Sequence, residues 1–313
     1  MFLDRLTSHR QYFMGIAIIL IILSHLLSAC KEIRPLWIFY PGFAGVDIFL
    51  FLSGYGLCNS WEKNTTGEFY ARRLRRILPM FLLLQVYVCM NQFLTDKDAT
   101  WLDVLCNFTT LSFWGVGGLR IEWYLSFLVY LYLLFPILYK ATHLGGLLLP
   151  ASLLGCVLAM QYLTDWPWNM DAAFPRIPVF ALGILCYQAR NPRRAYCVMS
   201  LLYGIAAILV AYMVVTHRAE KYQIVYMCAP LLMMALSAIS AKITEKGNAI
   251  YRLFGFCGKY SLEMYVANMM TLSLVPTFAL PPYTRLLTYI ALQALLTFII
   301  VHINIFIQKK HAV

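Results

Sequence analysis

The sequence predicts an all-α membrane protein, a polytopic bundle of about ten transmembrane helices with both termini in the cytoplasm. Apolar residues make up 61% of the 313-residue chain and charged residues only 12%, whereas soluble domains average roughly 45–50% and 25%. Apolar runs recur along almost the whole chain, and lysine and arginine collect in alternate loops between them. We therefore expect one integral membrane domain over residues 1–313 and no separate soluble domain.

Ten apolar runs are long enough to cross a bilayer, whose core of about 30 Å needs roughly 20 residues of helix. In chain order they are residues 11–30, 43–60, 77–94, 122–140, 145–163, 174–189, 197–216, 223–241, 258–279 and 285–307. The sixth run is short and begins with Pro175 and Pro178. The stretch 98–118 mixes Trp101 and Trp114 with polar residues, which predicts an interfacial loop or a half-helix.

The loops fix the orientation, because cytoplasmic loops of membrane proteins are enriched in lysine and arginine. With the N-terminus inside, 17 of the 25 basic residues fall in cytoplasmic loops and 8 in outer loops. The net charge of +11 is thus a topology signal, and we expect membrane lipid rather than nucleic acid as the partner. The nine cysteines contain no Cys-x-x-Cys pair, so we expect core residues and no metal site.

His25 is an ionisable residue in an otherwise apolar run, and such residues are functional candidates because burying them in lipid is costly. It lies 14 residues after Gln11, or about 21 Å of helix, which places it in the outer half of the bilayer. An imidazole there could bond a neighbouring helix. It could also act as a general base, since its pKa suits proton transfer near neutral pH.

Two carboxylates also lie within predicted spans. Asp47 is about two turns inside the second span, at a depth similar to His25, and could orient an imidazole or bind a substrate hydroxyl. The structural alternative is an ion pair with a base such as Arg34. Glu263 follows Lys259 by four residues, which favours a structural pair on one helix face.

Four arginines cluster at the cytoplasmic end of the third span, within the segment EFYARRLRRILP of residues 68–79. They are Arg72, Arg73, Arg75 and Arg76. Guanidinium groups match phosphate oxygens in pairs, so the cluster could clamp a phosphorylated ligand. It could equally anchor the span on anionic lipid.

Several of these stretches together resemble the acyltransferase-3 family of integral membrane acyltransferases. GIAIILIILSH resembles the family's first helix, which ends in its proposed catalytic histidine, and GVDIFLFLSGYGL resembles its GVD-x-FF-x-x-SG stretch. FYARRLRRILP resembles its F-x-x-R-R-x-x-R-x-x-P loop. WYLSFLVYLYLLFP, PVFALGILCY and FCGKYSLEMYV resemble three later segments, and all six occur in the family's order.

The resemblance implies transfer of an acyl group, in many members acetyl, from an acyl-CoA donor to a hydroxyl of a glycan or lipid-linked saccharide. It implies a place in the cell membrane, for which we expect the bacterial inner membrane, with acetyl-CoA as co-substrate and no permanently bound cofactor. The residues assigned in this way are His25 and Asp47 for catalysis, Arg72, Arg73, Arg75 and Arg76 for the donor, and Ser53, Glu122, Trp123 and Asn268 for substrate binding. Oligomeric state is not predicted.

Three positions depart from the family pattern. The family usually has a basic residue eleven positions before the histidine, where this chain has Met14; Arg10, one turn closer to the cytoplasm, could substitute by reaching up. Leu128 occupies a position where many members have glutamate. Asn268 replaces the family's late histidine, and an amide can donate and accept hydrogen bonds but cannot shuttle a proton.

Three other functions stay open on the sequence. A transporter or flippase of envelope precursors would also be polytopic, although transporters often have related halves, which we do not find here. An outer-face glycan polymerase is expected to have a large charged outer loop, whereas the longest outer loop, residues 95–121, has only Lys97 and Arg120 as bases. The replacements Met14 and Asn268 would also fit a non-catalytic family member.

Overall fold

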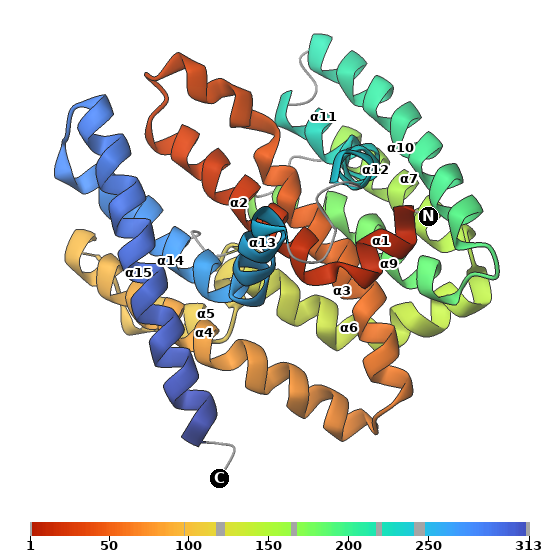
Figure 1. Cartoon of the computed structure of the whole chain (residues 1–313), viewed down its shortest axis with the longest axis horizontal. Helices are drawn as coiled ribbons and strands as arrows, with labels where there is room; N and C mark the ends of the chain where they lie inside the picture. The colour runs from red at the N-terminus through yellow and green to blue at the C-terminus, as the bar shows by residue number, and fades with distance from the viewer. Residues whose placement is uncertain are drawn as a thin grey trace. The chain divides into compact units, whose positions relative to one another are not determined.

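A computed structural model describes residues 2–96, 98–116, 123–163, 168–216, 221–240 and 248–310. Within these ranges every regular element is a helix, which confirms the predicted all-α fold (Figure 1). The α-helices are α1 (Phe2–Ser8), α2 (Arg10–Ala29), α3 (Gly45–Glu62), α4 (Thr66–Thr95), α5 (Trp101–Phe108), α6 (Trp123–Gly145), α7 (Leu148–Leu163), α8 (Trp168–Ala173), α9 (Ile177–Gln188), α10 (Pro192–Val215), α11 (Lys221–Met227), α12 (Ala229–Ile239), α13 (Ala249–Lys259), α14 (Ser261–Leu274) and α15 (Pro282–Lys310). The described ranges also contain the 3-10 helices η1 (Arg34–Ala44), η2 (Leu111–Trp114), η3 (Phe174–Arg176) and η5 (Val275–Phe278).

The chain divides into two compact units. Unit 1 consists of residues 1–17, 44–69 and 131–259, and unit 2 consists of residues 18–43, 70–130 and 260–313. Segments of α2, α4 and α6 belong to both units. The single domain over the whole chain stays a prediction.

Seven helical segments of the described ranges are long and apolar enough to cross a membrane. They are Arg10–Ala29, Arg34–Glu62, Thr66–Thr95, Trp123–Gly145, Asn169–Gln188, Pro192–Val215 and Pro282–Gln308. The chain is therefore a multi-pass membrane protein. Where the structure describes them, all ten predicted runs fall largely on helical segments, but the number of ten spans and the side of each terminus stay predictions.

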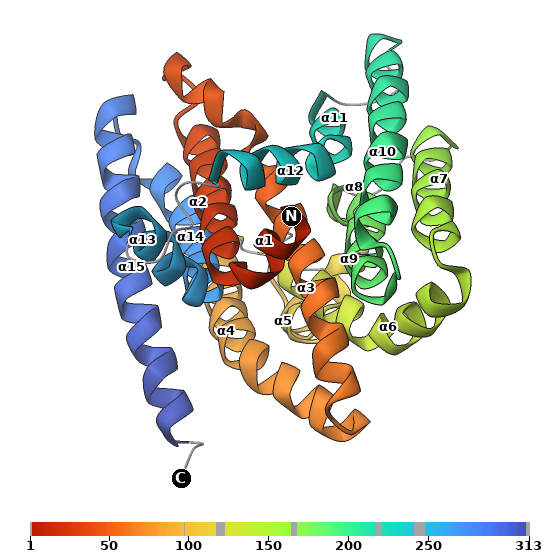
Figure 2. The same ribbon diagram turned by 45° about the vertical axis from the view of Figure 1, so that its right-hand side comes forward.

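The run 223–241 differs from the continuous span that its apolar composition predicts. It forms the short helices α11 and α12, which meet at Cys228, and α12 runs across rather than along α10 (Figures 1 and 2). Pro230 lies in the first turn of α12, where the amide hydrogen that proline lacks would have no partner within the helix. In the interior of one longer helix the same proline would remove a backbone hydrogen bond and interrupt the helix. The stretch 98–118 contains α5, as the half-helix prediction expects, and Thr100 and Asp103 cap its N-terminus reciprocally.

The core of unit 1 is built on a close contact between α3 and α9. A Cβ atom on Gly54 would lie 2.3 Å from the Phe180 carbonyl oxygen, and one on Gly183 would lie 2.2 Å from the Phe51 carbonyl oxygen. The two backbones therefore touch, as expected where small residues let membrane helices approach. This contact explains Gly54 of the SGYG segment and Gly183 of the ALG segment.

Unit 2 is organised around α14 and α15, which pack against each other. A buried apolar cluster joins them to the end of α2; its members are Leu26, Ala29, Cys30, Ile33, Val275 and Tyr289. Arg285 of α15 donates hydrogen bonds to the carbonyl oxygens of Ala29, at 3.2 Å, and Leu280, at 2.9 Å, and pairs with Glu32 at 2.9 Å. It thereby satisfies a carbonyl at the C-terminus of α2, which has no partner within the helix.

Large apolar side chains are exposed along α10 and α15, including Ile208, Tyr212, Phe298 and Phe306. Such a surface would be unfavourable in water but suits lipid, in which an α-helix satisfies its own backbone hydrogen bonds. These faces therefore suit contact with membrane lipid, the partner that the composition predicts.

Candidate active site

His25 lies on α2 and is half-buried. Its ring nitrogen Nδ1 forms a hydrogen bond with Oδ1 of Asn268 on α14. The structure thus brings together two predicted site residues that lie far apart in the sequence. Asn268 occupies the position of the family's late histidine, so this position contacts His25 here through an amide.

Asn268 is completely buried, and its side chain forms three hydrogen bonds. Its Nδ2 donates to the Tyr289 hydroxyl at 2.7 Å and to Oε1 of Gln293 at 3.1 Å. Both partners are on α15, and the sequence reasoning missed them. The available signal was Gln293 in the apolar run 285–307, since polar side chains inside a span usually bond to one another or belong to a functional site.

Asp47 lies in the first turn of α3 and is completely buried. Its Oδ1 is 3.4 Å from Nε of Arg176, which is 1% exposed. The guanidinium of Arg176 also lies over the ring of Tyr226, 4.0 Å from its centroid, a favourable cation–π geometry. A buried carboxylate needs such a partner, because an isolated charge in a low-dielectric interior is costly.

The structural alternative of an ion pair for Asp47 is therefore realised, with Arg176 rather than with Arg34 as its partner. The physical reason is the contact between α3 and α9: η3 leads directly into α9, so the close packing of α9 on α3 brings Arg176 beside Asp47. A basic residue directly before the segment IPVFALG was the sequence signal for it.

His25 belongs to unit 2 and Asp47 to unit 1. Each has its own partner, the neutral amide of Asn268 and the cation of Arg176. The orientation of the imidazole by Asp47 stays a prediction.

The arginine cluster lies on α4 itself. Helix α4 begins at Thr66, well before the predicted span 77–94, because Thr65 and Glu68 form a capping box: the Thr65 amide and hydroxyl bond to the Glu68 carboxylate at 2.9 and 3.0 Å. Arg72, Arg75 and Arg76 are consequently spaced at i, i+3 and i+4 on neighbouring positions of one helix surface.

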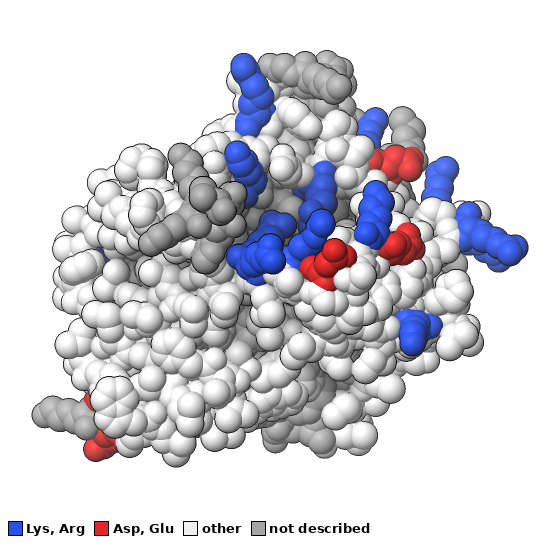
Figure 3. Space-filling model, turned by 90° about the horizontal axis from the view of Figure 1, so that it is seen from below, with Lys and Arg blue, Asp and Glu red and all other residues white. Residues whose placement is uncertain are grey.

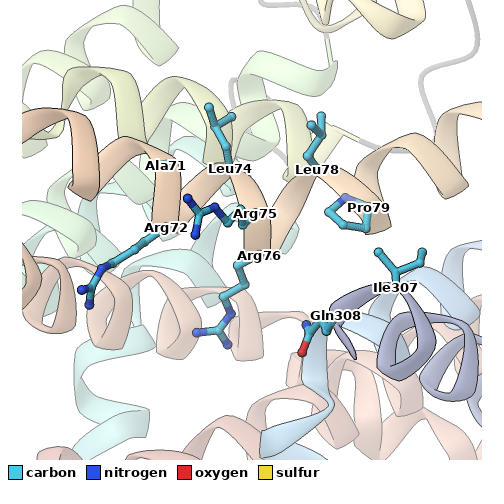
Figure 4. A pocket seen from close by; sticks show the side chains of 9 residues that line it. All are labelled: Ala71, Arg72, Leu74, Arg75, Arg76, Leu78, Pro79, Ile307 and Gln308. Atoms are coloured by element: carbon cyan, nitrogen blue, oxygen red, sulfur yellow. The ribbon is translucent and has the colours of Figure 1, made fainter. Parts of the chain in front are cut away.

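A cavity of about 830 Å³ adjoins these arginines in unit 2 (Figure 4). Its lining consists of Ala71, Arg72, Leu74, Arg75, Arg76, Leu78 and Pro79 of α4 with Ile307 and Gln308 of α15. The side chains of Arg72 and Arg76 extend away from Leu74 and Leu78 (Figure 4). Arg73, the fourth predicted donor-binding residue, is not in the lining. On the face drawn in Figure 3, lysine and arginine outnumber acidic residues.

The remaining predicted site residues lie in three places. Ser53 is buried in α3, directly before Gly54. Trp123 begins α6, and its ring centroid is 5.9 Å from that of Tyr124, which in turn packs against Tyr265 of α14. Glu122 lies outside the described residues.

Two further residues have structural partners. Glu263 is buried and accepts a hydrogen bond from Nδ2 of Asn304 on α15. The Arg10 guanidinium packs 3.4 Å from the point where a Cβ on Gly56 would lie, so it is held against α3. Met14, at the position of the usual basic residue, is buried.

Comparisons with known proteins identify a family that covers the segments described above. A family model described as "Acyltransferase domain" matches residues 12–307. The chain is 23% identical over 260 residues to "Putative acetyltransferase ORF330" of Acidianus two-tailed virus, with 76% of each chain covered. It is 33% identical over 96 residues to "Peptidoglycan O-acetyltransferase OatA" of Listeria monocytogenes, a match to 28% of this chain and 15% of that protein. None of the solved structures matches the chain.

The family model extends over nearly the whole chain, from the start of the histidine helix to the α15 wall of the arginine cavity. The seven membrane-crossing segments agree with an enzyme that works within a bilayer. The chain belongs to the acyltransferase-3 family and is a membrane O-acyltransferase.

Proposed function

We propose that the protein transfers an acetyl or other acyl group from cytoplasmic acyl-CoA to a hydroxyl of a cell-envelope glycan or lipid-linked saccharide. The observation behind the donor is the cavity lined by Arg72, Arg75 and Arg76. Coenzyme A has several phosphate groups, and guanidinium groups bind phosphate oxygens in pairs. The volume of about 830 Å³ also falls within the usual range for a small-molecule site.

The apolar part of the same cavity suits the remainder of the donor. Leu74, Leu78 and Ile307 offer contacts for the adenine ring and the pantetheine chain beside the phosphates. We place the cavity at the cytoplasmic end of α4, as the charge distribution of the loops predicts.

Helix α4 leads from this cavity towards the level of His25 within unit 2. Tyr87 lies eleven residues after Arg76, which corresponds to about 16 Å of helix. The Tyr87 hydroxyl donates to the Met270 carbonyl oxygen at 3.3 Å, and Met270 follows Asn268, the partner of His25, by two residues. An extended pantetheine arm that follows α4 would therefore bring the thioester towards the level of His25.

The reaction is an acyl transfer with His25 as general base. The acceptor oxygen attacks the thioester carbonyl carbon, a carbon–oxygen bond forms, and the carbon–sulfur bond breaks. His25 takes the hydroxyl proton and can return it to the leaving coenzyme A thiolate, so the products are an ester and the free thiol. Asp47 either orients His25 or binds the acceptor hydroxyl, with Arg176 holding its charge in place.

The donor site can be tested by binding of coenzyme A to the solubilised protein. We expect Arg72→Ala/Arg76→Ala to weaken binding strongly. Arg72→Lys/Arg76→Lys should also weaken it, because an ammonium group cannot form the paired contacts, but less strongly, because it keeps the positive charge. Arg193→Ala, an exposed arginine in the first turn of α10, is the matched control. Wild-type affinity in both double variants would leave only lipid anchoring for the cluster.

A glycan is proposed as the acceptor because the Listeria relative is named as a peptidoglycan O-acetyltransferase. The test is the O-acetyl content of envelope glycans from cells with and without the protein, in the cell membrane where we expect it to act. Unchanged ester content in every glycan fraction would contradict a glycan acceptor and leave donor binding as a separate result.

A further inference from the structure

We infer that Asn268 and Gln293 are positioning residues that hold His25 in the tautomer with its proton on Nδ1, so that Nε2 is free to accept the proton of the acceptor hydroxyl. The inference rests on the proposed function only for the role of Nε2 in transfer. The tautomer itself follows from hydrogen bonds within unit 2, and it can be measured without any activity assay.

The fixed point of the chain of hydrogen bonds is a backbone carbonyl. Nε2 of Gln293 lies 3.2 Å from the Met264 carbonyl oxygen and 3.1 Å from the Thr297 hydroxyl. A carbonyl oxygen can only accept, so the Gln293 atom that faces it must be the amide nitrogen. The oxygen Oε1 of Gln293 therefore points the other way, towards Asn268.

The orientation of Gln293 determines that of Asn268. An oxygen at Gln293 Oε1 requires a donor opposite, and Nδ2 of Asn268 occupies that position at 3.1 Å. The second hydrogen on Nδ2 is given to the Tyr289 hydroxyl at 2.7 Å. Rotating the Asn268 amide by half a turn would set its oxygen against the oxygen of Gln293. Asn268 is completely buried and Gln293 nearly so, so no water could separate the two oxygens and the rotated amide would be unfavourable.

The orientation of Asn268 in turn determines the tautomer of His25. The Asn268 atom that faces the imidazole is Oδ1, which can only accept. The ring nitrogen Nδ1 must therefore carry the hydrogen, and in the neutral ring Nε2 then holds the lone pair. The Met264 carbonyl thus fixes the orientation of Gln293, Gln293 fixes that of Asn268, and Asn268 fixes which nitrogen of His25 carries the hydrogen.

The amide at position 268 gives this arrangement a property that the family's usual histidine lacks. A histidine in contact with His25 could itself gain or lose a proton, and either nitrogen could then serve as donor or acceptor. An asparagine has one oxygen and one NH₂ group with fixed roles. The asparagine cannot carry a proton, but it provides a fixed acceptor for His25.

The tautomer can be measured by ¹⁵N NMR of the full chain labelled at histidine, at a pH high enough for the ring to be neutral. The His25 signals are identified by their loss in His25→Gln. We expect a protonated Nδ1 and an unprotonated Nε2 in the wild-type protein. A proton on Nε2 would overturn the inference whether or not any variant folds.

Gln293→Met removes the amide that connects Asn268 to the Met264 carbonyl while keeping a side chain of similar size. We expect both tautomers of His25 in this variant, a kcat that falls in proportion to the loss of the Nδ1-protonated form, and an unchanged KM for acyl-CoA. The matched control is Gln85→Met, the same change at a completely buried glutamine of α4 outside this chain of bonds, which should leave the His25 signals unchanged. A single Nδ1-protonated form in Gln293→Met would contradict the role of Gln293.

The two proposals can fail separately. An Nδ1-protonated His25 together with full activity of His25→Ala would support the positioning chain and remove the general base. An Nε2-protonated His25 together with an inactive His25→Ala would keep a role for His25 in transfer and remove the positioning chain.

Discussion

His25 and Asp47 are both ionisable residues inside apolar helices, but their surroundings differ. His25 meets a neutral amide, which orients the ring without adding charge. Asp47 meets the guanidinium of Arg176, which compensates its charge, and the aromatic face of Tyr226 covers that cation. An uncharged partner would leave the proposed base free to gain and lose a proton, whereas a cationic partner stabilises the ionised form of a carboxylate.

The first prediction concerns His25. His25→Ala should reduce acyl transfer by about 10²–10⁴-fold, since a positioned acid–base group contributes about that much. Asp47→Asn should lose less activity if Asp47 orients the ring and more if it binds the acceptor. Transfer to a glycan is measured beside thermal stability in detergent; near-normal turnover by a well-folded His25→Ala protein would remove the mechanism.

The second prediction separates stability from activity at Asp47. Arg176→Met leaves the carboxylate buried without its partner, and loss of one member of a buried pair typically costs about 3–5 kcal/mol. Asp47→Leu/Arg176→Met removes both charges and should recover most of the stability, because an apolar replacement of a buried pair is often neutral. The double variant should nevertheless remain impaired in transfer. Equal melting temperatures for wild type and Arg176→Met would show that the pair has no structural role.

At the scale of secondary-structure elements, backbone contact between α3 and α9 fixes where Asp47 and Arg176 lie. The contact is possible only because glycines face backbone carbonyls on both helices. In lipid, the apolar side chains gain little by choosing one another over acyl chains, so close van der Waals contact supplies much of the specificity.

Substitution of these glycines gives the third prediction. Gly54→Ala and Gly183→Ala should each destabilise the protein by about 1–3 kcal/mol or more, because the added methyl group would overlap a carbonyl oxygen that cannot move independently. The control is Gly204→Ala in α10, where no heavy atom lies within 4 Å of the added carbon. Thermal unfolding in detergent measures all three. Similar melting temperatures for Gly54→Ala and Gly204→Ala would refute the close contact.

At the scale of the whole molecule, the fourth prediction concerns topology. We expect cytoplasmic termini and an outward loop over residues 95–121. Cysteines placed at Asn64 and Asp98 in intact cells should behave oppositely towards an impermeant thiol reagent, with labelling at 98 only. The background should lack Cys156 and Cys197, the two exposed native cysteines of the described ranges. Labelling at 64 but not at 98 would reverse the orientation.

Local properties of the sequence determined the fold class and much of the family assignment. The length and apolarity of each run, and the charge of each loop, act through the bilayer and need no knowledge of neighbouring helices. The same is true of the arginines of α4, whose spacing on one helix follows from the helical repeat. One exception at this level is the run 223–241, where Pro230 in the first turn of α12 divides an apolar stretch into two helices. Another is the run 258–279, which is divided among the end of α13, α14 and η5.

Only the tertiary structure decided which polar residues meet. The pairing of Asp47 with Arg176, the bonds from Gln293 through Asn268 to His25, and the α15 wall of the arginine cavity all join residues distant in the sequence. The physical reason is that apolar helices are nearly interchangeable in their composition, so their neighbours are chosen by shape and by a few buried polar contacts. Those contacts depend on distances between helices, which neither periodicity nor charge counting can supply.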